Sequence, residues 1–127
     1  MATVLDVDDE PLIAMALEAA LEDAGHAVST AANGRQGLER LAEAPRPDLV
    51  LLDMMMPVMN GPAMLAAMGD DPDLAGTPVV VLSSLPEEAI RARAGEGVAA
   101  ILLKPCTAEQ VLHAVARALG EAREAGT

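Results

Sequence analysis

The chain has 127 residues and a mass of 13.0 kDa, the size of one domain, and 52% of its residues are apolar although Phe, Tyr and Trp are absent. Eight Lys and Arg against 20 Asp and Glu give a net charge of −12. This charge repels nucleic acids and anionic membrane surfaces, so we expect neither as a direct partner. The chain has a single cysteine, Cys106, and it has no apolar run of bilayer-spanning length and no signal-peptide layout. We therefore expect a cytoplasmic protein. We expect one domain over residues 1–127, with a core at about residues 2–120, a short polar C-terminal tail and no output domain.

Short apolar runs alternate along the chain with segments of helical periodicity. In chain order, the predicted strands are Thr3–Val7, His26–Thr30, Asp48–Leu52, Pro78–Leu82 and Val98–Leu103. The third run is apolar throughout after its first residue, which indicates a strand covered on both faces. This alternation is typical of βαβ units around a parallel sheet, so it predicts an α/β fold.

A predicted helix follows each predicted strand, and Pro, Gly, Asn or Thr residues mark where it starts or stops. The helices are predicted to start at Pro11, after Asn33-Gly34, at Gly61-Pro62, at Pro86 and after Thr107. The first four are predicted to end at Gly25, near Ala44, near Met68 and at Gly95 to Gly97. Thr107 is the predicted N-cap of the last helix.

Polar side chains stand at the ends of four predicted strands. They are Asp8 and Asp9 after the first strand, Asp53 after the third, Ser83 after the fourth and Lys104 after the fifth. We expect them to converge, because active groups of an open parallel sheet collect at the carboxyl ends of its strands. Clustered carboxylates raise one another's pKa unless a cation joins them, and their hard oxygen atoms suit Mg²⁺. Such a site would leave one carboxylate able to attack phosphorus, with a lysine and a hydroxyl beside it.

Each of these features has a simpler interpretation when it is taken alone. Asp8 and Asp9 would then be a solvated helix-capping pair, Asp53 a turn residue and Lys104 the exposed end of a loop. Ser83 and Ser84 would be turn hydroxyls. The functional interpretation is favoured only because all of them map to the same edge of the predicted sheet.

Four motifs occupy these strand ends and the residues next to them. They are Val7-Asp8-Asp9-Glu10, Leu51-Leu52-Asp53-Met54-Met55-Met56-Pro57-Val58-Met59-Asn60-Gly61, Val81-Leu82-Ser83-Ser84 and Leu103-Lys104-Pro105. In this order and spacing they resemble the receiver domains of bacterial response regulators of the CheY type. The resemblance spans essentially the whole chain and implies a doubly wound (βα)5 fold with a five-stranded parallel sheet in the order 2-1-3-4-5.

The resemblance also implies a role for each matching residue. Asp53 would be the phosphoacceptor, and Asp8, Asp9, Asp53 and the backbone carbonyl of Met55 would hold Mg²⁺, with Mn²⁺ as an alternative. Ser83 and Lys104 would contact the phosphoryl group as switch residues, with Ser84 beside them. The peptide bond before Pro105 would be cis and would aim the lysine.

The chain departs from the family pattern at several positions. Ile101 stands where many receivers have a Tyr or Phe that turns inward, so an altered switch is expected. Met55 and Leu85 occupy positions that influence the water attacking the phosphoaspartate, and their apolar side chains imply slow self-dephosphorylation. Asp6 lies within the first strand, where an apolar residue is common, so we expect it near a sheet edge or beside a hydrogen-bond donor.

The favoured hypothesis is a two-component receiver domain that catalyses only its own phosphorylation and dephosphorylation. Its partners would be a histidine kinase or histidine phosphotransfer protein and a downstream protein target, and a phosphorylation-dependent homodimer stays open. The alternative is a receiver-like interaction module that works without phosphorylation. A small phosphohydrolase is disfavoured, because such enzymes need an acidic residue two positions after the nucleophile, where this chain has Met55.

Overall fold

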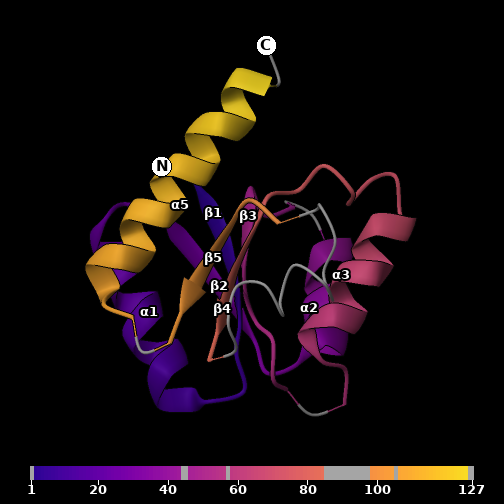
Figure 1. Cartoon of the computed structure of the whole chain (residues 1–127), viewed down its shortest axis with the longest axis horizontal. Coiled ribbons are helices and arrows are strands. Elements are labelled where there is room, and N and C mark those ends of the chain that lie inside the picture. Colours follow the sequence, from indigo (N-terminus) through magenta and orange to yellow (C-terminus); the bar gives the residue numbers. More distant parts are fainter. Residues whose placement is uncertain (1, 44–45, 57, 85–97, 105, 126–127) are drawn as a thin grey trace.

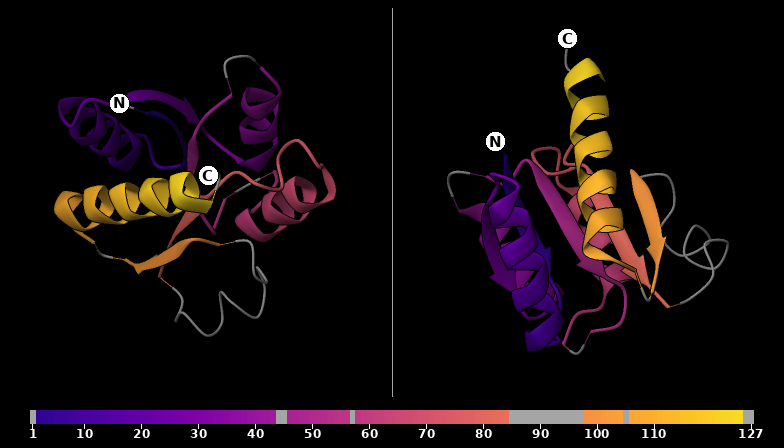
Figure 2. Two further views of the ribbon diagram at one scale, coloured as in Figure 1. Left: turned by 90° about the horizontal axis from the view of Figure 1, so that it is seen from above. Right: turned by 90° about the vertical axis from the view of Figure 1, so that its left-hand side faces the viewer.

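The computed structural model describes residues 2–43, 46–56, 58–84, 98–104 and 106–125. Its centre is a parallel sheet of five strands in the order β2-β1-β3-β4-β5, with helices on both faces (Figures 1 and 2). The strands are β1 (Thr3–Val7), β2 (Ala27–Ala31), β3 (Leu49–Asp53), β4 (Val79–Ser83) and β5 (Ala100–Leu103). The helices are α1 (Pro11–Asp23), α2 (Gly34–Ala42), α3 (Gly61–Asp70) and α5 (Ala108–Ala125). The predicted α/β fold and strand order are confirmed.

Two apolar cores lie on opposite faces of the sheet because successive strand residues point to opposite sides. On one face α2 and α3 pack on the sheet, and buried residues of this core include Leu5, Leu41 and Met64. On the other face α1 and α5 pack on it, and buried residues there include Leu21 and Val115. Every residue of β3 and β4 is buried, as expected for strands covered on both faces.

Side-chain oxygen atoms satisfy backbone N–H groups at the starts of three helices. The side chains of Asn33 and Asn60 accept hydrogen bonds from the third residues of α2 and α3 at 3.0 Å each. At α5 the Thr107 hydroxyl accepts from the Gln110 N–H at 3.1 Å, and the Gln110 side chain accepts from the Thr107 N–H at 2.8 Å. This reciprocal pair is a capping box and confirms Thr107 as the N-cap.

The predicted bounds differ from the observed ones mainly at the ends of elements. Strands β2, β3 and β4 begin and end one residue later than predicted, and β5 starts at Ala100 rather than at Val98. Helix α3 continues through Gly69 to Asp70, where a turn was predicted, and α5 reaches Ala125, beyond the predicted core. Gly25 follows α1 with a φ of 96°, as expected for a residue that ends a helix. The helix predicted from Pro86 lies outside the described residues.

The inner strands β1 and β3 are joined at their amino-terminal ends by a side chain as well as by the ladder. The Asp48 carboxylate accepts a hydrogen bond from the Thr3 N–H at 2.9 Å, and the Asp48 N–H donates to the Thr3 carbonyl at 2.7 Å. The two strands then run in register to Val7 and Leu52. Asp8, Asp9 and Asp53 therefore emerge from neighbouring strands at the same edge of the sheet.

The expectation for Asp6 is wrong. Asp6 lies in β1, between β2 and β3, with Thr30 and Leu51 as its cross-strand neighbours. Only 1% of Asp6 is exposed, and neither carboxylate oxygen has a hydrogen-bond partner among the described residues. The resemblance already implied an inner first strand, but no local signal in the sequence shows which side chains surround Asp6.

Candidate functional site

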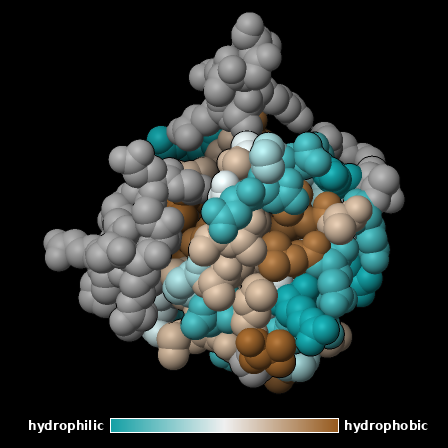
Figure 3. Space-filling view, turned by 90° about the vertical axis from the view of Figure 1, so that its right-hand side faces the viewer, coloured by the Kyte–Doolittle hydropathy of each residue, from teal (hydrophilic) through white to brown (hydrophobic). Residues whose placement is uncertain are grey.

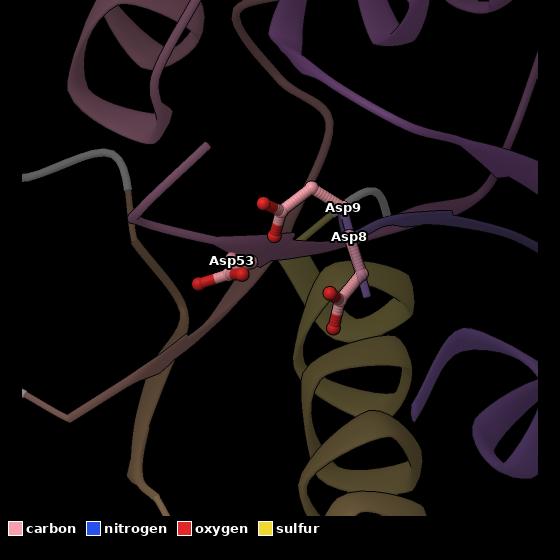
Figure 4. A group of neighbouring side chains, drawn as sticks. All are labelled: Asp8, Asp9 and Asp53. Atoms are coloured by element: carbon pink, nitrogen blue, oxygen red, sulfur yellow. The ribbon is translucent and has the colours of Figure 1, made fainter. Parts of the chain in front are cut away.

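The side chains predicted to form a site come together at the carboxyl-terminal edge of the sheet. Figure 4 shows the carboxylates of Asp8, Asp9 and Asp53 gathered around the adjoining ends of β1 and β3. One carboxylate oxygen from each of the three lies within 4.8 Å of the others. This spacing suits a single cation that accepts oxygen ligands from all three residues.

The two buried carboxylates are held by main-chain hydrogen bonds. Asp8 and Asp53 are each 4% exposed, whereas Asp9 is exposed to solvent. The Glu10 N–H donates to Asp8 Oδ1 at 2.8 Å, and the Met55 N–H donates to Asp53 Oδ1 at 3.2 Å. Asp8 Oδ2 is buried and has no hydrogen-bond partner among the residues that the structure describes. An orphaned anionic oxygen beside two more carboxylates is a group that a cation would satisfy.

Burial makes the ionised forms of these carboxylates unfavourable. Desolvation is the largest cause that raises the pKa of Asp8 above its ordinary value, and it likewise raises the pKa of Asp53. The main-chain hydrogen bonds and the positive charge of Lys104 oppose this rise at both residues. Among the residues that the structure describes, the Lys104 charge does not offset this desolvation, and a cation would stabilise the ionised carboxylates.

Lys104 supplies the positive charge of the site. Its Nζ lies 3.4 Å from Asp53 Oδ2, and its side chain is 21% exposed. The Lys104 N–H donates to the Ser83 carbonyl at 2.7 Å, which fixes the end of β5 against the end of β4. Ser83 is the last residue of β4 and is 1% exposed. The structure thus brings Asp53, Ser83 and Lys104 to one place, as the sequence predicted.

Other predicted residues lie around this group. Met55 lies two residues after Asp53 and is 62% exposed, and Ser84 is exposed next to Ser83. Ile101 is partly buried and packs against the core on the α2 and α3 face. Pro105 and Leu85 lie outside the described residues, so the cis peptide bond stays a prediction.

Two hollows flank the site and leave it accessible from solvent. A cleft of about 360 Å³ has Asp8, Asp9 and Met15 in its lining and extends toward α2. A largely apolar groove of about 580 Å³ lies between α1 and the start of α5, with Lys104 and Cys106 in its lining.

The comparisons with known proteins agree with this geometry. The family model described as "Response regulator receiver domain" matches residues 4–116. The chain belongs to the response regulator receiver domain family. The predicted family and the signalling class that it implies are therefore confirmed. Separately, none of the described helices is long and apolar enough to cross a membrane.

Individual relatives show how far the similarity extends. Protein PilH of Pseudomonas aeruginosa is 34% identical over 116 residues, which are 91% of this chain and 95% of PilH. The nitrate/nitrite response regulator protein NarL of Escherichia coli is 37% identical over 119 residues, which are 92% of this chain but only 54% of NarL. Among solved structures, the receiver domain of sensor histidine kinase PA1611 from Pseudomonas aeruginosa matches with a TM-score of 0.83 and 26% identity, covering 94% of this chain and 98% of that one. That structure has a magnesium ion coordinated in its active-site cleft.

Two backbone contacts that hold the residues after Asp53 could not be predicted from the sequence. Gly34 donates its N–H to the Met59 carbonyl at 2.9 Å, and Gly61 donates to the Met54 carbonyl at 3.2 Å. Val58, which lies in the chain between Met54 and Met59, has a φ of 65°. The Asn33-Gly34 turn signal was read only as a helix start, and nothing local in the sequence indicates that Gly34 meets a residue 25 positions later.

Proposed function

We propose that this receiver domain is a phosphorylation switch in which Asp53 accepts a phosphoryl group from a histidine kinase or a histidine phosphotransfer protein. The convergence of Asp8, Asp9 and Asp53 within 4.8 Å, with the Lys104 ammonium 3.4 Å from Asp53, carries this proposal. In the transfer an Asp53 carboxylate oxygen forms a bond to phosphorus as the bond from phosphorus to the donor's histidine nitrogen breaks.

The residues present fit a Mg²⁺ ion. Asp8, Asp9, Asp53 and the Met55 carbonyl would hold it, and Mn²⁺, which also prefers oxygen ligands, would be an acceptable replacement. The orphaned, buried Asp8 Oδ2 and the raised pKa of Asp8 and Asp53 support this assignment. When bound, the ion would neutralise negative charge on the phosphoryl oxygens and on the carboxylates. The magnesium ion in the similar PA1611 receiver supports the same choice of metal.

The chain's own polar groups would orient Asp53 and receive the phosphoryl group. The Met55 N–H already holds one Asp53 oxygen, and Lys104 faces the other. After transfer, the Lys104 ammonium would pair with a phosphoryl oxygen, and the Ser83 hydroxyl would contact another. Ser83 is the last residue of β4 and Lys104 directly follows β5, so the new charge would form at the sheet edge where both lie.

The output of the switch would be a change in protein binding. Phosphorylation would shift an existing equilibrium between two conformations through Ser83 and Lys104. Because Ile101 cannot act as an aromatic readout, the response would depend on the β4 end and the residues that follow it. The kinase and the target would be partners in the cytoplasm, and any phosphorylation-dependent homodimer would form there too.

Intact-mass spectrometry after incubation with acetyl phosphate and Mg²⁺ tests the proposal directly. One phosphoryl adduct is expected, and it should be absent in Asp53→Asn and after chelation of the metal. Asp48→Asn is the matched control, because Asp48 is an exposed carboxylate at the opposite end of β3. A folded wild-type protein that gains no adduct from acetyl phosphate or from a phosphohistidine donor would refute the proposal and favour the phosphorylation-independent module.

A further inference from the structure

The residues between β3 and α3 are fastened to neighbouring backbone at two points. At the first point the Met54 carbonyl accepts from the Gly61 N–H at 3.2 Å, within the same connection. At the second the Met59 carbonyl accepts from the Gly34 N–H at 2.9 Å, and Gly34 is the buried first residue of α2. The second contact ties the residues after Asp53 to a helix that belongs to another part of the chain.

The contact at Gly34 leaves no room for a side chain. A Cβ atom on Gly34 would lie 2.7 Å from the Met59 carbonyl oxygen and 2.9 Å from Met59 Cγ. Because the nearer of these atoms belongs to the backbone, a side chain at position 34 would have to push the connection away from α2. At Gly37, one turn later, the nearest atom to a Cβ would be Met64 Cε at 2.8 Å, the flexible end of a side chain.

Val58, next to Met59, has a strained backbone conformation that the contacts around it must hold in place. Its φ of 65° lies in the left-handed region, which β-branched residues rarely adopt. Val58 is 76% exposed, so burial of this residue does not offset the strain. Figure 3 shows hydrophobic residues exposed at the lower edge of the face that carries α2 and α3, the end at which this connection lies in Figure 1. Strain of this kind persists only when the surrounding structure holds it.

The attachment lies four residues from Met55, whose main chain meets the acidic site. The Met55 N–H donates to Asp53 Oδ1 at 3.2 Å, and its carbonyl belongs to the proposed cation site. We propose that Gly34 is a positioning residue for the acidic site, because its side-chain-free contact with Met59 sets where the Met55 main chain lies against Asp53. The part of this inference that concerns Mg²⁺ rests on the proposed function, whereas the attachment itself does not.

The first test compares Mg²⁺ binding to two glycine variants of the same helix. Gly34→Ala should weaken Mg²⁺ binding about tenfold in isothermal titration calorimetry, as expected when a group that orients a ligand is displaced. Gly37→Ala is the matched control, since it adds the same methyl group to the same helix but meets side-chain atoms of Met64 and Val7 in the core rather than the Met59 carbonyl. Its Mg²⁺ affinity should stay within about twofold of the wild type. Equal affinities of the two variants would overturn the inference even though the wild type binds the ion.

The second test needs no metal. Val58→Gly should raise the midpoint of thermal unfolding by about 3 °C in the wild type, because glycine adopts a positive φ without strain. In Gly34→Ala the connection is released, so the same substitution should give little or no increase. Such non-additivity supports the attachment even if the wild type fails to bind Mg²⁺, a failure that would count against the proposed function alone. Additive shifts would overturn the inference.

If Gly34→Ala does not fold, the wild type still provides an answer. Coupling between two sites is reciprocal, so Mg²⁺ should slow hydrogen exchange at the Gly34 amide. The Gly25 amide, which donates to the Glu22 carbonyl far from the site, should be unaffected. Exchange at Gly34 that does not change at saturating Mg²⁺ would overturn the inference.

Discussion

Replacing Asp6 with Asn tests the cost of an unpaired carboxylate in an inner strand. Burial is the largest cause that raises the pKa of Asp6 from its ordinary value of 3.8 to about 7, and the charges of Asp8, Glu18 and Asp53 add to the rise. The folded protein therefore keeps a proton on Asp6 at pH values where the unfolded chain has lost it. Asn has nearly the same shape as Asp but cannot ionise, so the substitution isolates the charge.

The sign and size of the effect follow from this pKa difference. Between pH 3.8 and about pH 7 the folded state binds more protons at Asp6, so the wild type loses stability as the pH rises through this window. Each unit of pKa difference corresponds to about 1.4 kcal/mol, so the full loss is about 4 kcal/mol. Between about pH 5 and about pH 8 the expected change is about 3 kcal/mol.

Urea unfolding followed by far-ultraviolet circular dichroism measures this change in a chain without Tyr or Trp. In metal-free buffer, the stability of Asp6→Asn relative to the wild type should rise by about 3 kcal/mol between about pH 5 and about pH 8. Asp8 and Asp53 also have raised pKa values, but they are present in both proteins and largely cancel in the difference. A difference that stays flat with pH would refute the reasoning and would mean that Asp6 is not buried as a titrating acid.

Three further predictions concern the metal, the lifetime of the phosphoryl group and a helix cap. Mg²⁺ at about 100 times its dissociation constant should raise the free energy of unfolding by about 3 kcal/mol in a urea titration, and Asp9→Asn should lose most of this gain. Met55→Asn should shorten the lifetime of the phosphoaspartate roughly tenfold, because an amide can orient the attacking water; decay of the mass adduct measures it, and an equal or longer lifetime would contradict the argument. Thr107→Ala should cost about 1 kcal/mol, since it removes the hydroxyl that caps α5, and an unchanged unfolding midpoint would show that the cap contributes nothing.

The helices and strands could be predicted because their signals are local, whereas the strand order was implied by the resemblance to receiver domains. Runs such as Thr3–Val7 and the buried β3 segment are apolar over strand length, and Pro11 and Thr107 mark helix starts by their own chemistry. The site could be predicted for a related reason, since parallel strands bring their carboxyl ends to one edge whatever their order. Element ends were less certain, because β5 is shorter than its apolar run and α3 continues through Gly69.

Features that depend on contacts between distant residues could not be predicted. Asp6 is a single polar residue within an apolar run, and the sequence does not show which side chains of the neighbouring strands and helices surround it. The positive φ of Val58 has no glycine or asparagine at that position to indicate it, and its cause lies in α2. Both are positions where the local preference of a residue and the folded structure disagree, and such disagreements often mark functional regions.

The contacts between β1 and β3 stabilise one end of the strand pair more than the other. At one end Asp48 and Thr3 exchange two hydrogen bonds, and at the other Asp8 and Asp53 hold like charges close together. We therefore expect β1 and β3 to separate first at their carboxyl-terminal ends, so that amide exchange becomes faster along β1 toward Val7. A cation held by Asp9 and Asp53 would close that end and act as a removable cross-link between two segments 44 residues apart in the chain.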